Sequence, residues 1–172
     1  MKELKVFLCN SKKERVETSI ELSKFNIFIG NDVDNIRRII SNARREAPVY
    51  GYEDFGSENS VSAHKYIVYE FLKYYSNKNK IAVIHTDSQF VLYTFNNLIF
   101  NYIVKDKMPA DLRDEMTCKD LMIDPNDIRI YQVENGIVTR IQNKDGLIEH
   151  NCFDNEMSII MNDFYKMIDY YE

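Results

Sequence analysis

Apolar residues along this chain follow two spacings, one typical of strands and one typical of helices. Short apolar runs predict strands at 5–8, 18–22, 25–29, 49–52 and 81–84. Apolar residues three and four positions apart predict helices at 36–45, 61–75 and 90–102, and a last helix that begins near Phe153. The segments 128–133 and 137–141 alternate around Glu134-Asn135-Gly136, which predicts a β-hairpin.

The order of these elements predicts the fold class. Strands that alternate with helices favour an α/β fold, in which a small and mostly parallel sheet is flanked by helices. We expect the hairpin and the amphipathic last helix to close one side of a single domain spanning residues 1–172. The charged segment 105–120 is predicted to be a mobile or inserted segment. An apolar stripe runs along the last helix, and we expect it to face the core, the alternative being a docking surface. Its members are Phe153, Met157, Ile160, Met161, Phe164, Met167, Ile168 and Tyr171.

Composition narrows the class of protein. A 45% hydrophobic content favours a globular domain, and the sequence has neither a long apolar run nor a signal peptide. We therefore expect a cytoplasmic protein without membrane contact, in the host cytoplasm if a phage encodes it. Cys9, Cys118 and Cys152 lack the spacing of a metal site and fit reduced thiols.

Charge bears on the choice of partner. The net charge of -5 disfavours broad contact with nucleic acid. One helix nevertheless carries four arginines, which could contact nucleic acid or an acidic partner, although a solvated helix face explains them more simply. They are Arg37, Arg38, Arg44 and Arg45.

The strand at 25–29 ends at Gly30, where a phosphate-binding loop of the form G-x-x-x-x-G-K-[ST] would begin. Counting from Gly30, the second glycine, the lysine and the hydroxyl residue are replaced by Asn35, Ile36 and Arg37. Asp32 and Asp34 add negative charge where a triphosphate would lie. Taken alone, this segment is better explained as an ordinary strand, turn and helix with a capping aspartate.

Two further junctions carry polar residues. The strand at 49–52 runs into Glu53 and Asp54, a pair of acids that could hold a metal ion and polarise water. The strand at 81–84 runs into His85-Thr86-Asp87-Ser88, and the helix that follows contains Asn96-Asn97-Leu98-Ile99. Ligands of open α/β sheets bind at this end of the strands.

Together with the C-terminal hairpin, these ordered segments resemble ABC-type ATPases of the overcoming-lysogenization and SMC-like kind. The resemblance implies a P-loop NTPase-like core with Glu53 and Asp54 in the Walker B positions. It also implies that Asp87 replaces the switch histidine that senses the γ-phosphate, with His85 two residues earlier as a substitute of uncertain direction. The interval from Gly30 to Glu53 is too short for the family's signature region.

We therefore expect a catalytically inactive, trimmed ABC-ATPase-like domain that binds ATP weakly or not at all and requires no cofactor. It would act by contact with another protein. We expect this partner to be a full-length ABC-type ATPase of a defence or repair system, which the domain would regulate or inhibit, or else a second copy of the domain itself. The alternative is a phosphoryl-transfer or nuclease enzyme that uses Mg²⁺ or Mn²⁺. Its acidic cluster would be Asp32, Asp34, Glu53, Asp54 and Asp87, with Glu53, Asp54 and Asp87 as the metal ligands.

Overall fold

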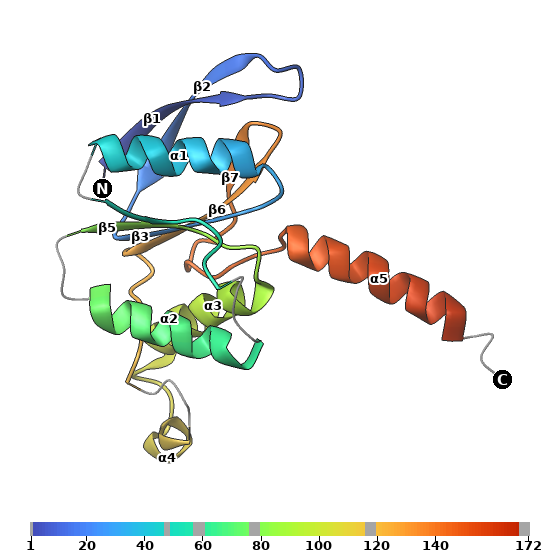
Figure 1. Ribbon diagram of the computed structural model, residues 1–172. Coiled ribbons are helices and arrows are strands. Elements are labelled where there is room, and N and C mark those ends of the chain that lie inside the picture. The colour runs from blue at the N-terminus through green and yellow to red at the C-terminus, as the bar shows by residue number, and fades with distance from the viewer. Residues whose placement is uncertain (1, 47–48, 57–60, 76–79, 116–119, 169–172) are drawn as a thin grey trace.

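The computed structural model describes residues 2–46, 49–56, 61–75, 80–115 and 120–168 (Figure 1). The elements in chain order are β1 (Lys2–Cys9), β2 (Arg15–Leu22), β3 (Phe25–Ile29), α1 (Val33–Glu46), β4 (Val49–Tyr52), α2 (Val61–Tyr75), β5 (Ile81–His85), α3 (Gln89–Val104), α4 (Ala110–Asp114), β6 (Ile128–Glu134), β7 (Ile137–Arg140) and α5 (Cys152–Ile168). Each predicted strand and helix is present, with bounds that differ from the prediction by a few residues.

The main sheet has five strands in the order β4-β5-β3-β6-β7. The pairs β4–β5, β5–β3 and β3–β6 are parallel, and the hairpin pair β6–β7 is antiparallel. The predicted α/β class with a mostly parallel sheet is therefore confirmed. β1 and β2 form a separate two-stranded antiparallel sheet, which the sequence pattern did not distinguish from the main one.

Helices cover both faces of the main sheet (Figure 1). On one face, α1 and the β1–β2 hairpin enclose a core that includes Phe28, Ile36 and Val83. On the other face, α2 and α3 pack on a larger core that includes Ile27, Phe71 and Ile84. Successive strand residues thus point to opposite cores, as the pleat of a strand requires.

α5 departs from its predicted position. The prediction that the last helix closes one side of the sheet, with its apolar stripe in the core, is wrong for the side chains that the structure describes. Phe153 is partly buried, but every side chain from 155 to 162 is exposed, and the helix runs away from the body of the molecule (Figure 1). The amphipathic pattern indicates that one face of this helix is apolar, but it does not specify which surface packs against that face.

The segment 105–120 contains the short helix α4, which the sequence pattern did not predict. Residues 116–119, and with them Cys118, lie outside the described residues, as does Tyr171 of the last predicted stripe. Among the described residues, no helix is both long and apolar enough to cross a bilayer.

Candidate functional site

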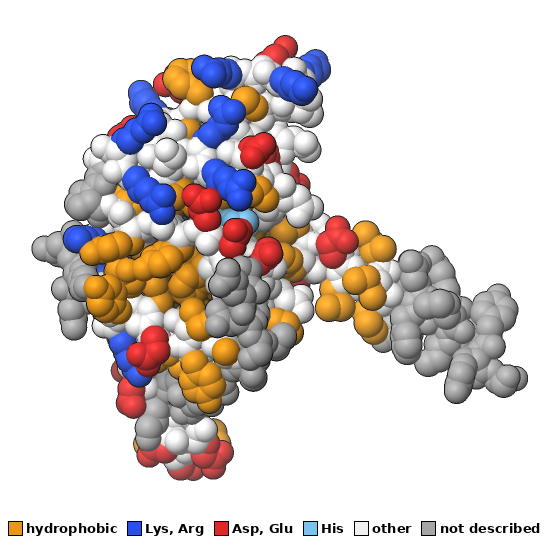
Figure 2. All heavy atoms as spheres, viewed as in Figure 1, with side chains coloured by type: hydrophobic (Ala, Val, Ile, Leu, Met, Phe, Trp, Pro, Cys, Tyr) orange, Lys and Arg blue, Asp and Glu red, His pale blue; other side chains and the backbone are white. Residues whose placement is uncertain are grey.

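The polar residues singled out in the sequence follow adjacent parallel strands. In the sheet, Tyr52 pairs with Ile84, and Phe28 pairs with His85, so β4, β5 and β3 end at nearly the same level. The residues after each strand therefore meet along one edge, where parallel strands place their ligand sites. Figure 2 shows acidic and basic side chains gathered around a histidine on the face that it draws.

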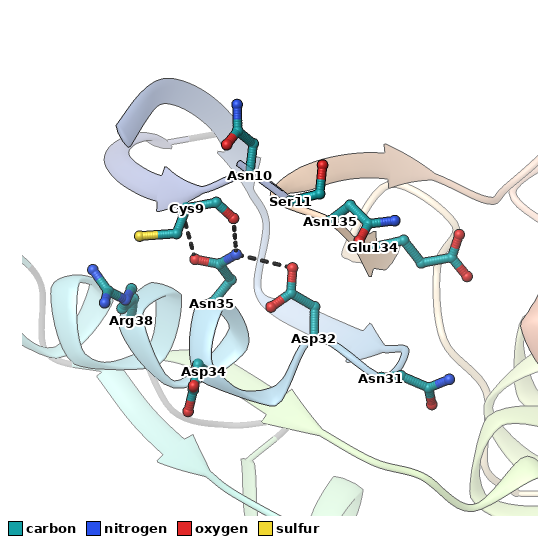
Figure 3. Close-up of a pocket in the computed structure, with 10 residues that line it drawn as sticks. All are labelled: Cys9, Asn10, Ser11, Asn31, Asp32, Asp34, Asn35, Arg38, Glu134 and Asn135. Carbon is teal, nitrogen blue, oxygen red and sulfur yellow. Dashed lines mark hydrogen bonds between the residues drawn. The ribbon is translucent and has the colours of Figure 1, made fainter. Parts of the chain in front are cut away.

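The loop after β3, where a phosphate-binding loop would lie, is held by hydrogen bonds (Figure 3). The buried Asn35 side chain accepts a hydrogen bond from the Cys9 N–H at 2.8 Å and donates to the Cys9 carbonyl at 2.7 Å. Asp32 Oδ2 accepts from Asn35 Nδ2 at 2.9 Å and from the Gly136 N–H at 2.8 Å. Polar groups of the loop are thus bonded to the two hairpins, β1–β2 and β6–β7.

A pocket of about 520 Å³ opens beside this loop. Three carboxylates line it, from Asp32, Asp34 and Glu134, against one guanidinium, from Arg38. A triphosphate needs cationic groups and free backbone N–H donors, and the charges of this lining are mostly of the wrong sign. Asp32 and Asp34, which the sequence singled out as negative charges after this strand, both line the pocket.

Neither the lysine position nor the hydroxyl position of the motif lines the pocket. Ile36 is fully buried in the core between α1 and the sheet. Arg37 lies on the exposed side of α1, where its Nε is 3.2 Å from Glu53 Oε2. On the same helix, Arg44 donates to the Gly51 carbonyl at 2.6 Å, so two of the four arginines contact the segment around β4.

The two acids after β4 have separate partners. Glu53 pairs with Arg37, whereas Asp54 Oδ1 lies 3.3 Å from His85 Nδ1. Asp54 has a positive φ of 57°, a conformation that Asp tolerates better than most residues and that commonly marks a constrained site. The turn after β4 is also hydrogen-bonded to β5, because the Phe55 N–H donates to the His85 carbonyl at 2.8 Å.

The direction of His85, which the sequence left open, follows from the pleat. His85 is 3% exposed, and it alternates with Ile84, which belongs to the core under α2 and α3, so its side chain lies on the α1 face with Val83. Its Nε2 atom is buried and has no hydrogen-bond partner among the residues that the structure describes. The imidazole thus contacts Asp54 through Nδ1, and its second nitrogen is enclosed by the protein.

Asp87 is separated from this pair by its own turn. Its side chain is exposed, and the next residue, Ser88, is the N-cap of α3, whose hydroxyl accepts from the Val91 N–H at 3.3 Å. The described residues contain no group of three or more His, Cys, Asp or Glu side chains placed to hold a metal ion. The interpretation of Glu53, Asp54 and Asp87 as metal ligands therefore gains no support from this geometry.

Sequence reasoning missed the contribution of Asn35. We counted it as a lost glycine, whereas its amide joins α1 to the end of β1. The only available signal was a polar residue on the otherwise apolar face made by Ile36, Ile39 and Ile40. Such a residue is expected to have hydrogen-bond partners, but its spacing does not say where they are.

No known protein-family model and no curated protein matches this chain. The resemblance to ABC-type ATPases therefore rests on the ordered sequence segments, and its functional content is a proposal.

Proposed function

We propose that this protein is an ABC-ATPase-like domain that neither binds nor hydrolyses ATP effectively and that acts through contact with another protein. The observation that carries the proposal is the pocket after β3, which three carboxylates and one arginine line. A nucleotide triphosphate in this pocket would face net repulsion, with few of its charges neutralised. We therefore take this pocket to be the counterpart of an ATPase nucleotide site, with side-chain charges that do not suit a triphosphate.

The strand order supports the resemblance. β5, which leads to Asp87, lies between β3, which leads to Gly30, and β4, which leads to Glu53. The three segments that would bind phosphate, metal and the attacking water thus occupy neighbouring positions on one edge, as a nucleotide site derived from this family requires. The scaffold is compatible with an ATPase ancestry, while the side chains at the edge contact one another: Arg37 with Glu53, and Asp54 with His85.

The proposed partner is a full-length ABC-type ATPase, for example of a defence or repair system, that this domain regulates or inhibits. ATPases of this family pair head to head through the edge that holds the nucleotide. The corresponding edge here offers the exposed Arg37 and Glu53 as charged contacts. A domain that occupies this edge without supplying a signature segment would prevent the partner from completing its own site.

Nucleotide binding is tested by calorimetric titration of the protein with ATP and Mg²⁺. We expect no saturable heat below about 1 mM ATP, which corresponds to a binding free energy weaker than about 4 kcal/mol. A micromolar dissociation constant would overturn the proposed inactivity.

Contact with a partner is tested by affinity purification from the native context, followed by identification of ATPases in the eluate. The variant is Arg37→Glu, which reverses one charge at the sheet edge, and the matched control is Arg45→Glu at the far end of the same helix. We expect an ABC-type ATPase to co-purify with the natural protein and with the control, and to be lost with Arg37→Glu. Equal recovery with all three proteins would show that this edge is not the contact.

A further inference from the structure

The turn between β6 and β7 carries a chemically reactive pair of residues. Asn135-Gly136 is the one place in the sequence where asparagine precedes glycine. This pair is the most prone to spontaneous deamidation, because glycine has no side chain to keep its own backbone nitrogen away from the asparagine amide. Asn135 is exposed, so solvent reaches its side chain. The turn therefore has the sequence and the exposure of a modification site.

Deamidation begins at the backbone N–H of Gly136. Hydroxide from the solvent removes this proton, and the nitrogen then attacks Cγ of Asn135. The N–Cγ bond forms and the Cγ–Nδ2 bond breaks, and ammonia leaves with a proton taken from water, which regenerates the hydroxide. Water then opens the five-membered imide at either of its two carbonyl carbons. The product at position 135 is aspartate or isoaspartate, and no oxidant or reductant takes part.

Asp32 holds the proton that this reaction must remove. Its Oδ2 atom accepts a hydrogen bond from the Gly136 N–H at 2.8 Å, although the two residues lie 104 positions apart in the chain. A carboxylate at this distance opposes loss of the proton, because the nitrogen anion would lie beside a second negative charge. Ring closure also abolishes the hydrogen bond, because the imide nitrogen carries no proton. The bond therefore stabilises the intact amide and not the imide.

The backbone of the turn acts in the same direction. Asn135 and Gly136 have φ values of 51° and 77°, the left-handed conformation of a two-residue hairpin turn. To close the ring, the Gly136 nitrogen must eclipse Cβ of Asn135, which needs a ψ well outside the range of about 30–60° that left-handed residues adopt. Rotation is opposed because Gly136 is buried against Cys9: a Cβ on this glycine would lie 2.6 Å from the Cys9 carbonyl oxygen.

We propose that Asn135 is a deamidation site whose reaction is slowed by the hydrogen bond from the Gly136 N–H to Asp32. Asn135 lines the same pocket as Asp32, Asp34 and Glu134 (Figure 3), so its deamidation adds a fourth carboxylate to the lining. Formation of the imide also releases the hairpin from its hydrogen bond to the loop after β3. The inference is independent of the proposed function, because it concerns a reaction of the chain itself.

The test follows the conversion of Asn135 by peptide mapping and mass spectrometry of the full chain in mildly alkaline buffer. The natural chain should react more slowly when folded than when unfolded in urea. Asp32→Ala should speed the reaction of the folded chain about 10- to 100-fold, the factor that corresponds to loss of a hydrogen bond to a charged group. Asp32→Asn keeps a neutral acceptor and should give a smaller increase. The matched control Asp34→Ala removes another carboxylate of the pocket and should keep the natural rate.

Two further readouts separate a local effect from general loosening of the fold. Asp145-Gly146 forms the same kind of imide by loss of water, so its isomerisation is an internal reference that should keep its rate in every variant. Exchange of the Gly136 N–H with heavy water also requires hydroxide to remove this proton. Asp32→Ala should therefore raise this exchange rate, measured by NMR, by a factor similar to that for deamidation.

Four results would overturn the inference. A natural chain that converts Asn135 as fast when folded as in urea has no such protection. An unchanged rate in Asp32→Ala would show that the turn geometry alone controls the reaction. An equal increase in Asp34→Ala would assign the effect to net charge, and a parallel increase at Asp145 would assign it to loosening of the fold. None of these results bears on the ATP titration, so this inference and the proposed function can fail separately.

Discussion

Replacement of Asn35 by alanine tests whether the loop after β3 is a structural joint. The Asn35 side chain is 2% exposed and satisfies both the N–H and the carbonyl of Cys9. Asn35→Ala leaves these two groups without partners in a partly buried place, at a cost of about 1–3 kcal/mol each when water cannot replace the amide. Alanine returns up to about 0.7 kcal/mol through its higher helix propensity. We therefore expect a net loss of about 1–6 kcal/mol in the free energy of unfolding.

The assay is urea unfolding followed by far-UV circular dichroism, because the chain has no tryptophan. With a slope of about 2 kcal/mol/M, the expected loss lowers the midpoint by about 0.5–3 M. The matched control is Asn42→Ala on the same helix, whose amide donates only to the Arg38 carbonyl at 2.8 Å, and whose midpoint should change little. All proteins are compared at one concentration, because self-association would add to the apparent stability. Equal urea midpoints for Asn35→Ala and Asn42→Ala would show that the Asn35 hydrogen bonds to Cys9 do not stabilise the fold.

Three further predictions concern the backbone and the pH dependence of stability. Gly30→Ala should lower the free energy of unfolding in urea by about 3 kcal/mol or more. Gly30 has a φ of +116°, and a Cβ there would lie 2.4 Å from the Val133 carbonyl oxygen. The control Gly51→Ala should cost less, because its Cβ would meet side chains. Burial raises the pKa of Tyr131 in the folded state, so the unfolded chain loses this proton first as the pH rises. The stability of the fold should therefore fall above about pH 10. A Tyr131→Phe variant should show a shallower fall in melting temperature over the same pH range. The Asn126 N–H donates to Asp124 and holds the pKa of this carboxyl below its usual range. The stability that the carboxylate contributes is therefore present above about pH 4 and is lost on acidification. In a pH series of melting temperatures, Asp124→Asn should be less stable than the natural chain at pH 7 and less sensitive to acid.

Much of the fold could be predicted because local patterns and tertiary packing agree. The apolar run at 25–29 is buried on both sides in β3, and the Glu134-Asn135-Gly136 turn forms the predicted hairpin with Asn135 and Gly136 at positive φ. The position of the candidate site was predictable for the same reason, since parallel strands bring their carboxyl ends to one edge.

The parts that could not be predicted depend on partners distant in the chain. Asn35 acts through Cys9, 26 positions earlier, and no spacing rule connects the two residues. The direction of His85 depends on which face of β5 carries the α1 core, which the strand alone does not specify. The apolar pattern of α5 predicted burial in the core, but the side chains from 155 to 162 are exposed, and the pattern alone does not specify where the helix packs.

The central position of β3 has a consequence for how the chain reaches its native state. Phe25 of β3 pairs with Ile128 of its neighbour β6. About 100 further residues must therefore be synthesised before the second edge of β3 can be covered. During synthesis, an apolar strand with one open edge is therefore exposed until most of the protein has left the ribosome. Such an edge is a template for pairing with other chains, so folding yield should depend on chaperones and on the speed of translation more than the stability of the finished fold suggests.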